Sequence, residues 1–260
     1  MLRMSLNLLL SVERAGAVSN WRAKIAEESM GVGLFVAGTD TDVGKTAVAV
    51  AIVRQLVGAG LKVGVSKPVA SGVDPATLAT SGDAARLWEA AGRPGSIGDV
   101  CPQAFRLPIS PPRSARAAGR TVDERLVCSG IEAWRAGSDV VVVEGAGGLF
   151  SPLGDTLSNA DVARRLGLPV VIVDAARLGA IGRSLALVRA ARAESLAVAA
   201  VVLSEVEPPA GDPADPASPA AIGRDSRDDL AAMLAPLPVL ILRHGGGVFT
   251  PGIDWLGLAR

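Results

Sequence analysis

The sequence predicts an α/β fold in which helices cover both faces of a doubly wound, mostly parallel sheet. Two observations lead to this prediction. Short apolar runs alternate along the chain with segments of helical periodicity, which is the pattern that parallel strands joined by helical crossovers produce. The runs are apolar at consecutive positions, as strands buried on both faces require. Sheets of this kind bind their ligands beyond the carboxyl ends of the strands.

A strand is assigned to each apolar run bounded by turn residues, and a helix to each segment with apolar residues three or four positions apart. The predicted strands lie near residues 33–37, 62–66, 140–144, 169–174, 198–203 and 238–242. The predicted helices lie near residues 44–58, 83–91, 122–136, 159–166, 181–193 and 224–234. Residues 73–112, which include several prolines and glycines, are expected to carry a loop over the site, and residues 207–219 to form a surface loop.

The 260-residue chain is long enough for one α/β domain with a sizeable core, which we place at residues 31–260. Residues 1–30 do not fit the strand–helix pattern and are predicted to be an N-terminal extension. Their apolar patch, Leu6–Leu10, is too short to span a membrane. The acidic residues Glu13, Glu27 and Glu28 argue against an organelle presequence.

Charge and rare residue types exclude several classes of function. The 26 basic and 26 acidic residues give a net charge of zero without a basic stripe, so we expect no nucleic-acid partner. Cys101 and Cys128 have no metal-binding spacing and suit the reducing cytoplasm, where we expect the protein to reside. His244 is the only histidine and lies in a glycine-rich segment, which argues against histidine-based catalysis.

A glycine-bounded loop follows the first predicted strand and precedes the first predicted helix. Its residues are Gly38, Thr39, Asp40, Thr41, Asp42, Val43, Gly44, Lys45 and Thr46. The N–H groups of such a loop, with the helix N-terminus, bind polyphosphate, so the fold is predicted to be P-loop NTPase-like. Lys45 would contact the outer phosphates and the Thr46 hydroxyl would bind Mg²⁺. Because five residues rather than four separate the glycines, a turn that binds nothing is the alternative.

Two further motifs lie at the ends of predicted strands. The first, at residues 67–72, reads Lys-Pro-Val-Ala-Ser-Gly, and the second, at residues 143–148, reads Val-Glu-Gly-Ala-Gly-Gly. A carboxylate at the end of a buried strand is costly unless it is paired, which marks Glu144 as a candidate site residue. The chain has only four lysines, Lys24, Lys45, Lys62 and Lys67. Lys45 and Lys67 fall in motifs, where a compact positive charge is useful.

Together, these two motifs and the loop Gly-Thr-Asp-Thr-x-Val-Gly-Lys-Thr resemble the dethiobiotin synthetase family, from about Gly33 to about Pro209. The resemblance implies an ATP- and Mg²⁺-dependent cyclo-ligase of biotin biosynthesis. In that reaction CO₂ converts 7,8-diaminopelargonic acid to a carbamate, ATP phosphorylates the carbamate, and the second amine closes the ring. The products are dethiobiotin, ADP and phosphate. The family's site is completed by a second subunit, so the resemblance also implies a homodimer.

The resemblance implies roles for individual residues. Lys45 and Lys67 would be catalytic, and Lys67 would face the carbamate, which Ser71 would help to orient. The nucleotide would be bound by Thr39, Asp40, Thr41, Asp42, Val43, Gly44, Lys45, Thr46, Glu144, Gly147 and Ser204. Mg²⁺ would be held by Thr46, Asp83 and Glu144, although Asp83 at a helix start also fits a plain N-cap. The substrate would be bound by Lys67, Ser71 and, at a helix start of the other subunit, the amides of Gly179, Ala180 and Ile181.

The chain departs from the family pattern at four positions. Pro112 stands where the family usually has a histidine, and Gly182 and Arg183 stand where it commonly has asparagine and histidine. Ser204 replaces an asparagine that typically contacts the adenine edge. These departures leave the phosphate chemistry intact, but they leave base specificity and substrate binding open.

Three other functions fit parts of the sequence. A switch-type P-loop ATPase of the partitioning or metal-cluster-carrier kind needs a lysine near the loop start, where this chain has Thr39, and gives residues 67–72 no role. A related amide-forming synthetase usually carries a glutaminase domain with a nucleophilic cysteine, for which this chain lacks the room and the residues. A diverged homologue that acts on another diamine stays open because the substrate loop is altered at Gly182 and Arg183.

Overall fold

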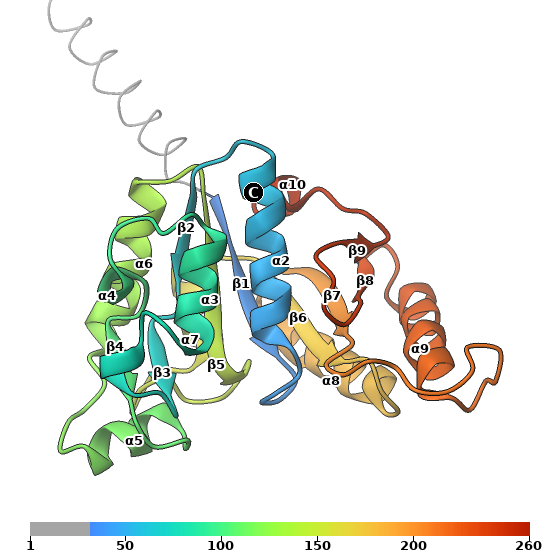
Figure 1. Ribbon diagram of the computed structural model, residues 1–260, viewed down its shortest axis with the longest axis horizontal. Coiled ribbons are helices and arrows are strands. Elements are labelled where there is room, and N and C mark those ends of the chain that lie inside the picture. The colour runs from blue at the N-terminus through green and yellow to red at the C-terminus, as the bar shows by residue number, and fades with distance from the viewer. Residues whose placement is uncertain (1–31) are drawn as a thin grey trace, which may run out of the picture. The chain divides into compact units, whose positions relative to one another are not determined.

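In the computed structural model, which describes residues 32–260, seven strands form one sheet in the order β2-β5-β1-β6-β7-β8-β9 (Figure 1). The strands are β1 (Val32–Gly38), β2 (Val63–Ser66), β5 (Val140–Gly148), β6 (Val170–Ala175), β7 (Val198–Ser204), β8 (Val239–Leu242) and β9 (Phe249–Thr250). Every pair is parallel except β8 with β9. Two short strands, β3 (Val69–Ser71) and β4 (Gln103–Phe105), pair in parallel beside it. The predicted fold class is confirmed.

Helices cover both faces of the sheet, as predicted (Figure 1). The apolar residues of the first face contact α2 (Lys45–Gly58), α3 (Gly82–Ala90), α4 (Ile97–Val100) and α10 (Trp255–Leu258). Those of the second face contact α5 (Pro111–Ala117), α6 (Glu124–Ala136), α7 (Asn159–Leu166), α8 (Ala180–Ala193) and α9 (Pro219–Leu234). A short 3₁₀ helix, η1, spans Pro75–Thr77.

The sheet separates two hydrophobic cores because successive side chains of a strand point to opposite faces. Along β1, Leu34 and Val36 belong to the first core, while Phe35 and Ala37 belong to the second. The four valines of β5 divide in the same way. All of these side chains are fully buried, which explains why the strand sequences are continuously apolar.

Local details differ from the expectations. Residues 73–112, which were expected to carry one helix and a loop over the site, also form η1, α4, β4 and the start of α5. The helix expected near residues 224–234 begins at Pro219, because Ser218 accepts a hydrogen bond from the Ala221 N–H as its N-cap. The C-terminal elements β9 and α10 were not predicted at all. The extension predicted at residues 1–30 lies outside the described residues.

The carboxyl ends of β2, β5, β1 and β6 lie side by side at one edge of the sheet. Lys67 follows β2, Glu144 lies near the end of β5, and the glycine-bounded loop follows β1, so the three motifs converge by topology alone.

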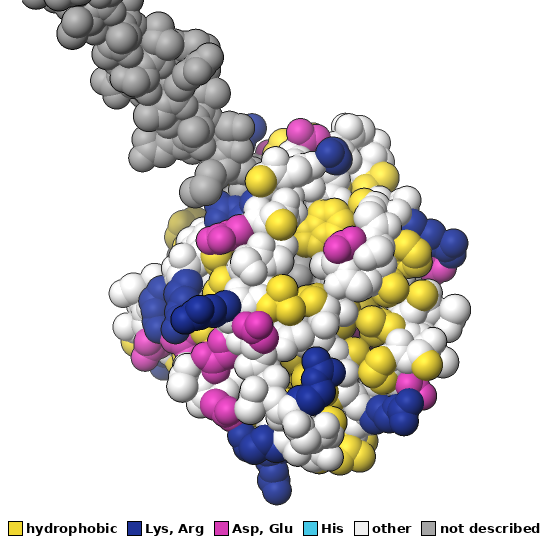
Figure 2. All heavy atoms as spheres, turned by 90° about the vertical axis from the view of Figure 1, so that its left-hand side faces the viewer, with side chains coloured by type: hydrophobic (Ala, Val, Ile, Leu, Met, Phe, Trp, Pro, Cys, Tyr) yellow, Lys and Arg dark blue, Asp and Glu magenta, His cyan; other side chains and the backbone are white. Residues whose placement is uncertain are grey.

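No helix within residues 32–260 is both long and apolar enough to cross a membrane. On the face shown in Figure 2, basic side chains are interspersed with acidic and apolar ones and do not gather into a stripe. This face therefore offers no basic track of the kind that nucleic-acid backbones require.

Candidate active site

The loop between β1 and α2 needs both of its glycines. Gly44 is the N-cap of α2 and has a φ of 92°, in the left-handed region that favours glycine. A Cβ on Gly38 would lie 2.6 Å from the carbonyl oxygen of Asp40. A side chain at either position would therefore distort the loop. The first N–H groups of a helix have no partner within that helix, and a helix start behind such a loop can bind phosphate.

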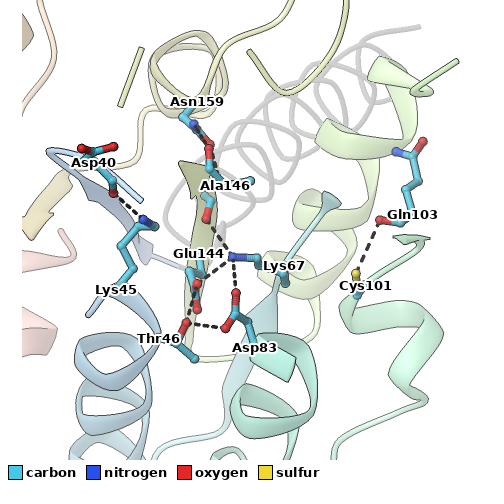
Figure 3. A network of polar contacts seen from close by, with 11 residues as sticks. Asp40, Lys45, Thr46, Lys67, Asp83, Cys101, Gln103, Glu144, Ala146 and Asn159 are labelled. Carbon is cyan, nitrogen blue, oxygen red and sulfur yellow. Dashed lines mark hydrogen bonds and ion pairs between the residues drawn. The ribbon is translucent and has the colours of Figure 1, made fainter. Parts of the chain in front are cut away.

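Lys45 and Thr46 are the first two residues of α2, and both are buried. Lys45 Nζ donates a hydrogen bond to the Asp40 carbonyl oxygen at 2.7 Å, so the lysine lies across the loop (Figure 3). Burial lowers the pKa of Lys45, and the positive charge of Lys67 lowers it further. An anion bound at the loop would raise the pKa of Lys45 again by attracting its positive charge. Lys45 therefore suits a phosphate ligand.

Three oxygen atoms converge beside Lys45. Thr46 Oγ1 lies 2.8 Å from Asp83 Oδ1 and 2.8 Å from Glu144 Oε1, but a hydroxyl has one proton and can donate to only one of them. Glu144 Oε2 is buried and has no hydrogen-bond partner among the described residues. A hydroxyl and two carboxylates with unused lone pairs fit a hard cation such as Mg²⁺, which takes few protein ligands and keeps several waters.

The described residues contain no cluster of three or more His, Cys, Asp or Glu side chains that could hold a metal ion. The oxygen groups that meet at this point are the Asp83 and Glu144 carboxylates and the Thr46 hydroxyl. That set is too sparse for a structural zinc site, which takes four nitrogen or sulfur ligands.

Lys67 holds the two carboxylates together. Its Nζ lies 2.7 Å from Glu144 Oε1 and 3.0 Å from Asp83 Oδ2, and it also donates to the carbonyl oxygen of Gly145 at 3.0 Å (Figure 3). Burial opposes the charge of Lys67, but the attraction of Glu144 and Asp83 prevails and raises its pKa. Lys67 is therefore positively charged at neutral pH.

The two carboxylates differ in their environments. Burial raises the pKa of Glu144 despite the attraction of Lys67. Burial also acts on Asp83, but the charge of Lys67 and the hydrogen bond from Thr46 outweigh it and lower the pKa of Asp83. Asp83 does not serve as a plain helix cap, because α3 begins at Gly82 with Ser81 as its N-cap. The Asp83 side chain instead contacts Thr46 and Lys67.

The glycine loop that ends β5 is shaped by Asn159, a buried residue that the sequence reasoning missed. Asn159 Nδ2 donates to the carbonyl oxygens of Ala146 and Gly148, both at 2.8 Å, and its Oδ1 accepts from the Ala146 N–H at 3.1 Å. A Cβ on Gly145 would lie 2.4 Å from Asn159 Oδ1. A signal exists in the sequence, since Ser158 and Asp161 form a capping box that fixes Asn159 at the start of α7.

A cavity of about 1030 Å³ opens at this edge of the sheet. Most predicted site residues line it: Thr41, Asp42, Gly44, Lys45, Thr46, Lys67, Ser71, Asp83, Glu144, Gly147 and Ser204. Asp40 contributes its carbonyl oxygen to Lys45, Val43 is buried in the first core, and the Thr39 hydroxyl bonds to Asp174. Gly179, Ala180 and Ile181 lie at the start of α8 and do not line the cavity of their own chain.

Several cavity residues lie outside the predicted set, among them Arg54, Arg86, Glu205 and Arg243. Arg86 lies one turn after Asp83 on α3, so helical spacing could have found it. At the Ser204 end, Glu205 accepts a hydrogen bond from the His244 N–H at 3.1 Å. Pro112 is buried in α5, while its neighbours Ser110 and Pro111 line the cavity.

Comparison with known proteins gives consistent matches. The profile of a protein family described as an AAA domain matches residues 32–242. An ATP-dependent dethiobiotin synthetase (BioD) of Rhodopirellula baltica is 40% identical over 188 residues, which cover 66% of this chain and 72% of that protein. A protein of the same name from Anaeromyxobacter dehalogenans strain 2CP-1 is 42% identical over 202 residues, which cover 78% and 89% of the two chains. A nucleotide-binding protein of Archaeoglobus fulgidus, solved with ADP, aligns with a TM-score of 0.47 at 14% identity over 89% of this chain and 86% of that one.

Proposed function

The chain belongs to the ATP-dependent dethiobiotin synthetase family, and we propose that it uses ATP to close the cyclic urea of dethiobiotin from 7,8-diaminopelargonic acid and CO₂. The observation that carries this proposal is the convergence of Lys45, Thr46, Lys67, Asp83 and Glu144 at one wall of one cavity. The reaction forms two carbon–nitrogen bonds, which makes the enzyme a cyclo-ligase.

The phosphate end of the cavity is formed by the start of α2. The N–H groups of this helix end and the Lys45 ammonium neutralise the polyphosphate, which is most of what phosphoryl transfer demands of a protein. Thr46, Asp83 and Glu144 would hold Mg²⁺, which supplies charge neutralisation at the transferred phosphoryl group. Two observations support this assignment. Glu144 Oε2 has no hydrogen-bond partner among the described residues, and the one hydroxyl proton of Thr46 can serve only one of the two carboxylates beside it.

Lys67 suits the carbamate. An amine of the substrate adds to CO₂, loses a proton and becomes a carbamate anion beside Lys67. A carbamate oxygen then takes the γ-phosphoryl group and ADP leaves. The second amine attacks the carbonyl carbon, the ring closes, and phosphate departs with loss of the amine's proton. Lys67 is fixed by Glu144 and Asp83, so its charge is already in place when the anion forms.

We also propose a homodimer in which Gly179, Ala180 and Ile181 of one subunit complete the site of the other. Two facts support it: these residues are absent from the lining of their own chain's cavity, and Leu178 beside them is 80% exposed. A two-fold axis would create two equivalent sites from one patch. The two cysteines, Cys101 and Cys128, are both free, which supports a cytoplasmic location.

The decisive experiment incubates the purified protein with ATP, Mg²⁺, bicarbonate and 7,8-diaminopelargonic acid, and detects dethiobiotin by mass spectrometry. We expect a product that depends on all four components and ADP released in equal amount. ATP hydrolysis that proceeds equally well without the diamine would instead point to a switch-type ATPase. Product formation with a different diamine but not with this one would assign the chain to a diverged branch of the family.

A further inference from the structure

Asp174 is a fully buried carboxylate to which the proposed chemistry gives no role. It lies near the end of β6, whose other residues are all apolar. Among the described residues that line the cavity, Asp174 does not appear. A buried carboxylate is retained only where charges and hydrogen bonds compensate its lost hydration, so its partners indicate what it does.

Asp174 joins two loops that belong to different parts of the site. Its Oδ1 accepts hydrogen bonds from the Thr39 hydroxyl at 2.7 Å and from the Ala175 N–H at 2.8 Å. Arg183 Nε lies 3.1 Å from both carboxylate oxygens. Thr39 begins the phosphate loop after β1, while Arg183 lies in the first turn of α8. One carboxylate therefore connects the nucleotide loop to the segment proposed to bind the substrate.

The other side of the Arg183 guanidinium fixes the backbone in front of α8. Its Nη1 donates to the carbonyl oxygen of Leu178 at 3.3 Å. Gly179, the N-cap of α8, lies so close that a Cβ there would be 2.9 Å from the same nitrogen. The amides that follow directly, those of Ala180 and Ile181, are the proposed ligands of the substrate carboxylate. Their position is thus tied to that of Arg183.

The charges of the two residues explain each other. A cation in the first turn of a helix is unfavourable, because that end already carries partial positive charge. The first turn of α8 holds no acidic residue to offset Arg183, but Asp174 does so from β6. Conversely, without Arg183 the buried anion of Asp174 would repel any carboxylate that approached this helix end. Removing either charge alone therefore leaves the other one unbalanced.

We propose that Arg183 is a positioning residue for the carboxylate of the substrate. Arg183 pairs with Asp174, which in turn is hydrogen-bonded to Thr39, and it fixes the backbone of residues 178–180. Its positive charge also neutralises the charge of Asp174. This inference rests on the proposed function, because it assumes that the start of α8 binds the carboxylate of the diamine. It gives a physical reason for an arginine at a position where the family commonly has histidine.

The test compares Arg183→Gln, Arg183→Lys, Asp174→Asn and the double variant Asp174→Asn/Arg183→Gln, with Arg189→Gln on the exposed side of α8 as the matched control. The readouts are the KM for 7,8-diaminopelargonic acid and the calorimetric Kd for ATP. Arg183→Gln should raise the KM by about tenfold or more, the value of a charge-assisted contact, and change the Kd by less than about twofold. The KM of Arg183→Lys should lie between those of Arg183→Gln and wild type, because lysine keeps the positive charge but lacks the planar pair of donors of the guanidinium.

The double variant tests the charge balance between Asp174 and Arg183 most directly. Removing Asp174's charge together with that of Arg183 should recover much of the KM lost in Arg183→Gln, because no unbalanced anion then remains. A substrate analogue with a methyl group in place of the carboxylate should be used equally poorly by wild type and by Arg183→Gln. Two results would overturn the proposal. One is that Arg183→Gln raises the KM equally for the diamine and for its methyl analogue. The other is that the KM of the double variant rises by the product of the factors found for the two single variants.

Folding of each variant is checked by circular dichroism and thermal unfolding. If Arg183→Gln does not fold, Arg183→Lys and the double variant still decide the question, because both keep the local charge balanced. A wild-type protein that makes no dethiobiotin would refute the proposed function itself. Wild-type turnover with a KM that does not respond to Arg183 would refute only this inference.

Discussion

Gly44 packs directly against the side chain of Ser204: a Cβ on Gly44 would lie 2.3 Å from Ser204 Oγ. Gly44 begins α2 with a positive φ of 92°, so conformation and space both require glycine at this position. The end of β7 therefore contacts the phosphate loop at the N-cap of α2. Ser204 stands where the family pattern typically has an asparagine, and its Oγ and Cβ are the two atoms nearest to the Cβ position of Gly44.

Gly44→Ala should therefore lower the affinity for ATP by about tenfold or more, because left-handed backbone strain and the contact with Ser204 add together. Gly58→Ala is the matched control. Gly58 ends the same helix, and no described atom lies within 4 Å of the Cβ it would gain. Calorimetric titration with ATP measures both variants. Equal affinities would mean that the loop tolerates the displacement.

Nucleotide preference should be weak. Ser204 offers one hydroxyl where an asparagine amide could both donate to and accept from a purine edge, and one neutral hydrogen bond is worth roughly 0.5–1.5 kcal/mol. We expect CTP and GTP to support turnover within about one order of magnitude of ATP, as that energy implies. The kcat/KM values of the three nucleotides check this. An ATP preference beyond about a hundredfold would assign base recognition to other residues, with Glu205 and Arg243 the first to test.

Asp83→Asn and Glu144→Gln should each raise the Mg²⁺ concentration needed for half-maximal turnover by about tenfold or more, since even outer partners of a metal contribute that much. The matched control is Glu132→Gln on exposed α6. Magnesium titrations of the rate, with thermal unfolding to confirm the fold, make the measurement. Titration curves that superimpose on wild type would remove the two carboxylates from the metal site.

Lys67→Gln should reduce dethiobiotin formation by about a hundredfold, the typical loss when one preorganised donor to a developing charge is removed. The Kd for ATP should change little, because Lys45 and the start of α2 serve the phosphates. The exposed Lys62 provides the control, as Lys62→Gln. A parallel loss of turnover and of ATP affinity would place Lys67 on the phosphates instead.

ATP binding should take up a proton at alkaline pH. Burial and the positive charge of Lys67 lower the pKa of Lys45 in the free protein, and bound phosphates raise it again. Affinity is therefore highest below the lowered pKa and falls as pH rises through it. Calorimetry in two buffers of different ionisation enthalpy counts the proton. Lys45→Arg, which stays charged, should show no uptake; a wild type without uptake would contradict the prediction.

The strands and the convergence of the motifs could be predicted from the sequence, because buried valine runs leave little ambiguity and parallel strands place their carboxyl ends together. Each predicted strand is found within one residue of its start, although β5 continues through the glycine loop to Gly148. The pairing of Glu144 also follows from the cost of a buried charge, but the identity of its partner, Lys67, required the strand order β2-β5-β1.

The elements that escaped prediction are short or depend on distant contacts. The strands β3 and β4 have three residues each, too few for a periodic signal. The capping box of Ser158 and Asp161 predicts where α7 begins, but it does not show that the Asn159 side chain bonds to the glycine loop of β5. Thr39 was predicted to bind the nucleotide, and in the structure its hydroxyl donates a hydrogen bond to Asp174. Periodicity cannot identify that partner.

Substitutions in the two hydrophobic cores should differ in their effect on the site. The helices that bear Lys45, Thr46 and Asp83 pack on the first face of the sheet, so repacking there would displace the candidate site residues. The second core lies on the other face of the sheet, and the effects of changes at well-separated sites add with little coupling. Sequence changes and deliberate stabilisation should therefore concentrate on the second face under α6 and α9, on the opposite side of the sheet from the helices that bear Lys45, Thr46 and Asp83, where a new side chain should leave turnover unchanged.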